Sequence, residues 1–143
     1  MSHPTNTAPY RGHGSIPLRF VLWLTQIVLA FVFGMAGWMK ATYPLDALAM
    51  YVPWSPHVPD TLVRFIGTAE FLGAIGVILP ALTRIKPMLT PLAAALLSLT
   101  MIFAIGFHLA RGESHAIVLP LMLGVLGLFV AWGRTKKAPI RGR

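Results

Sequence analysis

The chain has 143 residues, of which 56% are hydrophobic and only 11% are charged. A soluble domain carries roughly 25% charged residues, so this composition predicts a membrane protein. The absence of cysteine excludes disulfides, thiolate nucleophiles, Cys-ligated zinc and iron–sulfur clusters within this chain. The net charge of +8 does not predict a nucleic-acid partner, because the cations flank the apolar stretches as they do in membrane proteins.

Four apolar stretches predict four membrane-spanning helices, at residues 18–39, 61–81, 87–108 and 116–132. Residues 1–17 are polar and rich in Pro, Gly and His, which is typical of a flexible tail. Residues 133–143 form a second, basic tail. We therefore predict an all-α fold with one transmembrane domain at residues 18–132, an antiparallel four-helix bundle between two cytoplasmic tails.

The charges predict the orientation of this bundle. Three of the twelve Lys and Arg residues fall on one side of the predicted membrane: Lys40, Arg64 and Arg111. The other nine fall on the opposite side: Arg11, Arg19, Arg84, Lys86, Arg134, Lys136, Lys137, Arg141 and Arg143. Positive charge accumulates in the cytoplasm, so both termini are predicted to lie inside. We expect a multi-pass protein of the bacterial inner membrane, with anionic lipid against the basic side.

The first outer connection is long enough to contain structure of its own. It begins with Pro44, continues with helix-forming residues to Tyr51, and then contains Pro53, Pro56 and Pro59. We predict a short interfacial helix followed by a rigid, kinked return to the second span. A plain loop is the alternative.

One carboxylate, Glu70, lies about half-way through the second span, which is predicted to begin at an N-capping Asp60. A charge at that depth requires a partner, a cavity or a proton. Its face of the helix carries Gly67, Gly73 and Ala74, with Gly76 one turn further on, and these small residues allow close approach of another helix. Two interpretations stay open: Glu70 bonds another span and holds its register, or it handles a ligand or a proton.

Two cations are candidate partners of Glu70. Lys40 ends the first span above Gly37 and Gly34, and either snorkels to the interface or leans inward. Its side chain is too short for the expected difference in depth, so a water or a ligand atom is expected between Lys40 and Glu70. Arg64 can pair with Asp60 or with Glu70.

The third span ends in a polar cluster of His108, Arg111, Glu113 and His115. The spacing is not that of a known metal motif, so we predict no metal and expect these groups to cap helix ends. Haem ligation needs two histidines inside the bundle, and only His108 lies close to a span.

Three segments resemble the DoxX-like family of small four-helix membrane proteins. They are the first-span motif at residues 33–40, the glycine-rich run at residues 67–80, and residues 107–113. The positions that match are Lys40, Glu70 and His108. The resemblance implies a redox-associated membrane protein that binds a quinone or another membrane-soluble ligand, because the family is named after a membrane subunit of a thiosulfate–quinone oxidoreductase.

Three functions therefore stay open, and the sequence identifies no catalytic residue. A protein that binds a quinone-like ligand, with Glu70, Lys40, His108 and Arg64 as candidate ligand-binding residues, predicts an apolar cavity that reaches Glu70. A non-catalytic assembly subunit of a larger complex, or a homo-oligomer, predicts a filled bundle. A small-molecule or proton carrier predicts a polar path to the cytoplasm, where only Thr25, Gln26 and Ser98 are available.

Overall fold

The computed structural model describes residues 14–143, and the described chain folds into four long helices with short connections. The long helices are α1 (Ile16–Thr42), α3 (Asp60–Thr83), α4 (Leu89–Ala110) and α5 (Val118–Trp132). A 3-10 turn, η2 (Ser114–Ile117), precedes α5, and a π-helical turn, η3 (Gly133–Lys137), continues it. The helices α1, α3 and α4, together with the continuous segment Ser114–Lys137 that joins η2, α5 and η3, are long and apolar enough to cross a membrane, as the sequence predicts.

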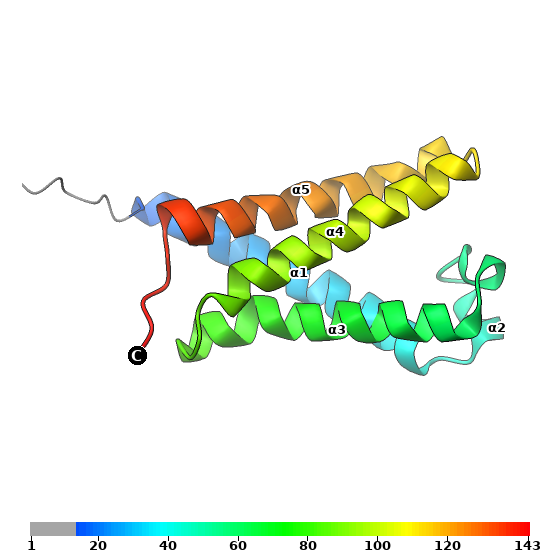
Figure 1. The fold of residues 1–143 in the computed structure, drawn as a ribbon, viewed down its shortest axis with the longest axis horizontal. Helices are drawn as coiled ribbons and strands as arrows, with labels where there is room; N and C mark the ends of the chain where they lie inside the picture. Colours follow the sequence, from blue (N-terminus) through cyan, green and yellow to red (C-terminus); the bar gives the residue numbers. More distant parts are fainter. Residues whose placement is uncertain (1–13) are drawn as a thin grey trace, which may run out of the picture.

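The helices form an antiparallel bundle made of two pairs (Figure 1). Helix α1 packs along α3, α4 packs along α5, and α3 joins the pairs by packing on α4. The basic sequence segments lie at one end, which contains the start of α1, the α3–α4 turn and η3 (Figure 1). Toward the opposite end, which carries α2, the α4–α5 pair diverges from the α1–α3 pair (Figure 1).

Apolar side chains from every long helix fill the interior of the bundle. The buried core consists of Leu29, Phe33, Ala74, Val77, Ala94, Leu97, Met101, Leu123 and Val130. Large apolar side chains also cover the outside, and examples such as Phe20, Phe65 and Phe103 are about 70% exposed. Such a surface is stable in lipid and not in water.

The connection between α1 and α3 contains a short helix, α2 (Leu45–Leu48), and a 3-10 turn, η1 (Ser55–His57). Leu48 and Val52 pack on Val63 of α3, which folds the connection back over the end of the bundle. Its position at a membrane interface remains a prediction. Asp60 is the first residue of α3, and not its N-cap: Pro59 occupies that position.

Glycines allow the backbones of α1 and α3 to touch. A Cβ added to Gly37 would lie 2.6 Å from the amide nitrogen of Phe71, and one on Gly67 would lie 2.7 Å from that of Ala41. Gly73 and Gly76 meet side chains of α4, whereas a Cβ on Gly34 would make only an ordinary contact of 3.7 Å with Ala74. The α1–α3 crossing is therefore the tightest of those that these glycines make.

Candidate functional site

The centre of the candidate site is an ion pair between α1 and α3. Lys40 Nζ donates a hydrogen bond of 2.5 Å to Glu70 Oε2, and both side chains are buried. The contact is direct, so the sequence-based expectation of an intervening water or ligand atom is wrong. The physical reason is the glycine crossing: Lys40 lies beside Gly67, one turn or about 4.5 Å along α3 from Glu70.

Burial makes this pair energetically sensitive. Removing one partner from a buried pair leaves an uncompensated charge, which typically costs about 3–5 kcal/mol. Replacing both partners with apolar side chains of similar volume is often neutral or stabilising. The pair therefore holds α1 and α3 in register, and a role beyond register requires a test that removes both charges together.

Arg64 does not contact Glu70 or Asp60 in the structure, contrary to both pairings considered from the sequence. Its guanidinium donates hydrogen bonds to the carbonyl oxygens of Lys40, at 2.9 Å, and Tyr43, at 2.6 Å. These carbonyls belong to the C-terminal end of α1, where helix acceptors lack partners within the helix. Arg64 thus fastens the end of α1 to α3 and positions Lys40 through its backbone.

Two aromatic side chains connect the ion pair to α4. Lys40 Nζ lies 5.7 Å from the centroid of the Trp54 ring, within the range of a cation–π interaction. The Trp54 ring lies 6.1 Å from that of Phe107, which lies 5.5 Å from the ring of His108. Trp54 was not among the site residues predicted from the sequence. The signal that could have identified it is its place between Pro53 and Pro56, in a rigid segment beside a span.

His108 belongs to a second polar group, at the end of the bundle that carries α2. Its Nδ1 donates to Glu113 Oε2 at 2.8 Å, and Arg111 Nε donates to Glu113 Oε1 at 2.9 Å. These hydrogen bonds, first from His108 and then from Arg111, hold the pKa of Glu113 below its ordinary value. Within residues 14–143, no group of three or more His, Asp or Glu side chains is arranged to hold a metal ion.

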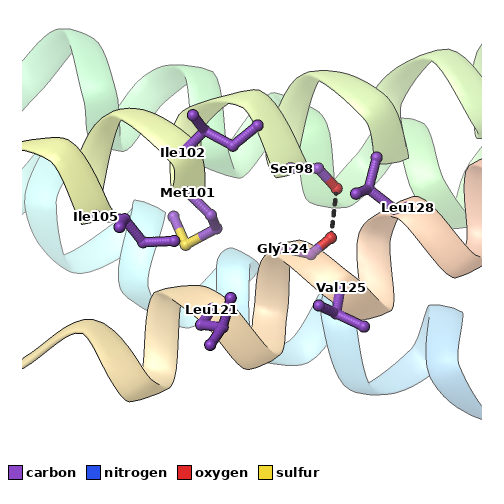
Figure 2. A pocket seen from close by; sticks show the side chains of 8 residues that line it. All are labelled: Ser98, Met101, Ile102, Ile105, Leu121, Gly124, Val125 and Leu128. Atoms are coloured by element: carbon purple, nitrogen blue, oxygen red, sulfur yellow. Dashed lines mark hydrogen bonds between the residues drawn. The ribbon is translucent and has the colours of Figure 1, made fainter.

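Two pockets lie elsewhere, on the seam between α4 and α5. The first encloses about 80 Å³ beside Ser98, whose hydroxyl bonds to the carbonyl of Gly124 (Figure 2). The second, of about 550 Å³, lies nearer the basic end and is lined by Leu92 and Trp132 among others. Neither includes Lys40 or Glu70, so neither is the cavity that a ligand at Glu70 would require.

The three polar side chains that could begin a path to the basic end are engaged by backbone carbonyls. Thr25 donates to Val21 at 2.9 Å, Gln26 to Val77 at 2.8 Å, and Ser98 lies 2.9 Å from the carbonyl oxygen of Gly124. Each group therefore has a structural partner, and this arrangement offers no support for a carrier.

A sequence model of the DoxX-like family matches residues 24–130. This chain belongs to the DoxX-like family. The match covers the second and third apolar stretches completely and most of the first and fourth, and it includes Lys40, Glu70 and His108. None of the curated proteins and none of the solved structures matches this DoxX-like protein.

Proposed function

We propose that this DoxX-like protein is a redox-associated membrane protein that binds the polar head of a quinone-like ligand at its outer end, beside Lys40 and Glu70. The observation that carries the proposal is the buried ion pair in contact with Trp54. An ionisable pair inside a span is by default a candidate functional site. We place the protein in the bacterial inner membrane, with the basic end against anionic lipid in the cytoplasmic leaflet.

The ion pair offers complementary groups for a quinone head. A lysine ammonium has three N–H donors, and in the described residues its one hydrogen-bond acceptor is Glu70. A carbonyl oxygen of a quinone accepts from a remaining donor of Lys40. The hydroxyl of a reduced quinol instead donates to Glu70. The same two residues therefore suit both redox forms, while the electrons come from a bound cofactor or from a partner's thiols, because the chain has no cysteine.

The aromatic residues suit a flat ring. Trp54 and Phe107 meet in an edge-to-face arrangement between the connection that follows α2 and helix α4. The two helix pairs diverge at this end (Figure 1), and we place the entry of the ring at the Trp54–Phe107 contact. A ring inserted there stacks on aromatic faces and has its oxygen directed toward Lys40.

The test separates ligand binding from packing by removing the pair as a unit. The double variant Lys40→Met, Glu70→Met should keep a melting temperature close to that of the wild type, because apolar side chains replace both charges. It should lose co-purified quinone and bind a short-chain ubiquinone analogue at least about tenfold more weakly. Leu72→Met, on the exposed face of α3, is the control and should bind normally.

A second candidate function, a non-catalytic assembly subunit, is favoured by the filled α1–α3 crossing. It predicts that the Lys40→Met, Glu70→Met protein binds the quinone analogue as the wild type does and still assembles in the same membrane complex. Quantitative quinone extraction and native electrophoresis of mild-detergent extracts distinguish the two. Unchanged quinone content in the double variant would end the ligand proposal.

A further inference from the structure

A buried arginine at the basic end has a role that its place in a basic tail does not suggest. Arg134 follows α5 in η3 and is only 4% exposed. Its Nε donates a hydrogen bond of 2.7 Å to Gln26 Oε1 on α1, and its guanidinium carbon lies 5.2 Å from the Trp23 ring centroid. Gln26 in turn donates to the Val77 carbonyl, so the side chain of Arg134 is held by α1 and, through Gln26, by α3.

Two nitrogens of the Arg134 guanidinium lack a good hydrogen-bond acceptor. Its Nη1 has a long contact of 3.5 Å with the Ala138 carbonyl. Its Nη2 is buried and has no hydrogen-bond partner within residues 14–143. A buried donor without an acceptor is destabilising, and a buried cation without an anion is more so.

No carboxylate side chain of the described protein forms an ion pair with Arg134. The acidic residues lie in the outer connections or inside α3: Asp46, Asp60, Glu70 and Glu113. Besides its burial, Arg134 experiences the charge of Arg19, which is another cation. The surroundings of Arg134 therefore supply a donor, an aromatic face and positive potential, but no counter-anion.

We propose that Arg134 is the centre of a phosphate-binding site that takes the phosphodiester of an anionic membrane phospholipid. A guanidinium binds phosphate oxygens through paired N–H donors, and Nη2 and Nη1 are the two whose hydrogen bonds are missing or long. Trp23 lies over the guanidinium and is partly exposed, so we place the approach of the phosphate beside this ring. The exposed Phe20 and Leu24 beside it provide an apolar surface for an acyl chain.

The position of Arg134 at the end of α5 favours a lipid phosphate over free phosphate. Arg134 lies where the apolar part of α5 ends, and Trp132 and Trp23 lie beside it, as aromatic residues do at a membrane interface. The inference rests on the proposed placement of this end at a membrane surface. It is independent of the quinone-like ligand at Lys40.

The experiment measures lipid binding to delipidated full-length protein in detergent by native mass spectrometry and by thermal shift. Phosphatidylglycerol is the probe. Phosphatidylcholine, which also has a phosphodiester but no net charge, tests whether binding requires a net negative charge. Inorganic phosphate tests whether the site binds free phosphate instead of a lipid. The wild type should bind phosphatidylglycerol at least about tenfold more tightly than phosphatidylcholine and should melt at a higher temperature when it is bound. No difference between the two lipids would overturn the proposal without any variant.

Variants test the site itself. R134Q should weaken phosphatidylglycerol binding at least about tenfold, and R134K, which keeps the charge but not the fork, should also weaken it. K136Q removes the same charge from an exposed neighbour and should change binding less than about threefold. If R134Q and K136Q lose the same amount of affinity for phosphatidylglycerol, the lipid is attracted only by the general positive charge of this end, and the proposal of a specific site at Arg134 is overturned. Competition by millimolar inorganic phosphate would overturn the assignment to lipid.

The Lys40→Met, Glu70→Met protein shows whether the proposed quinone site and the proposed lipid site are independent. It should retain wild-type affinity for phosphatidylglycerol, because the two sites lie at opposite ends of the bundle. Failure of the quinone proposal therefore leaves the Arg134 site standing, and failure at Arg134 leaves the quinone proposal standing.

Discussion

The close crossing of α1 and α3 can be tested by adding a single methyl group at Gly67. In Gly67→Ala, the new Cβ would lie 2.6 Å from Lys40 Cβ, 2.7 Å from the Ala41 nitrogen and 2.8 Å from the Gly37 carbonyl oxygen. Non-bonded atoms of these kinds prefer about 3.5–4.0 Å, so α1 and α3 must separate by about 1 Å. Two of the three contacts are with backbone, and a side-chain rotation cannot relieve them.

The magnitude follows from two opposing terms. Overpacking a well-packed interior costs about 3 kcal/mol at the upper end of its usual range. Replacing a helical glycine with alanine returns about 1 kcal/mol through helix propensity. The net loss of about 2 kcal/mol corresponds to a fall in melting temperature of roughly 4–8 °C for a chain of this size. The same displacement lengthens the Lys40–Glu70 hydrogen bond and weakens it.

The assay is thermal unfolding in detergent, followed by circular dichroism, with two companion variants. A Cβ on Gly106 meets nothing within 4 Å, so Gly106→Ala should melt at or above the wild-type temperature. A Cβ on Gly73 meets only the Leu97 side chain, which can rotate, so Gly73→Ala should be intermediate. If Gly67→Ala melts as high as Gly106→Ala, α1 and α3 do not pack through this glycine and the reasoning fails.

Two further predictions follow from the arrangement of charges. Single cysteines at His57 and Ile140 should react differently with an impermeant thiol reagent in intact spheroplasts: position 57 is labelled and position 140 is not, and the reverse pattern would invert the topology. Because the pKa of Glu113 is lowered in the folded protein, its bonds to His108 and Arg111 stabilise the outer turn above the ordinary glutamate pKa. This stabilisation is lost as pH falls through the lowered value, so the hydrogen-exchange protection factors of that turn, which correct for the intrinsic pH dependence of amide exchange, should fall in the wild type once the pH is below the ordinary glutamate range. In Glu113→Gln the protection factors should already be low at neutral pH and should not show that step.

The membrane-spanning helices could be predicted because their signal is local. Long apolar stretches, bounded by charges and prolines, specify helices in lipid whatever their neighbours do. The predicted second span, residues 61–81, lies within Asp60–Thr83 of the structure. The burial of Glu70 and its small-residue face could also be predicted, since helical periodicity places Gly67 and Gly73 beside it.

The partners of the charged residues could not be predicted, because they depend on helix ends and crossings. The first span was expected to stop at residue 39, but α1 continues to Thr42 because Arg64 on α3 holds its last carbonyls. That extension, together with the crossing at Gly67, brings Lys40 within direct reach of Glu70. A choice among several possible ion pairs depends on distances of a few ångströms between helices, which no local pattern contains.

Arg134 illustrates the same contrast between features that the sequence predicts and features that depend on packing. Charge counting along the sequence was enough to assign Arg134 to a basic tail, which is a statement about topology alone. Only the packing of η3 against α1 makes it a buried guanidinium bonded to Gln26, which lies 108 residues earlier in the chain. The segments that enter the membrane follow from composition alone, because transfer into lipid is an additive property of each segment. The tertiary structure decided which polar groups meet inside it, because that depends on close contacts between segments far apart in the chain.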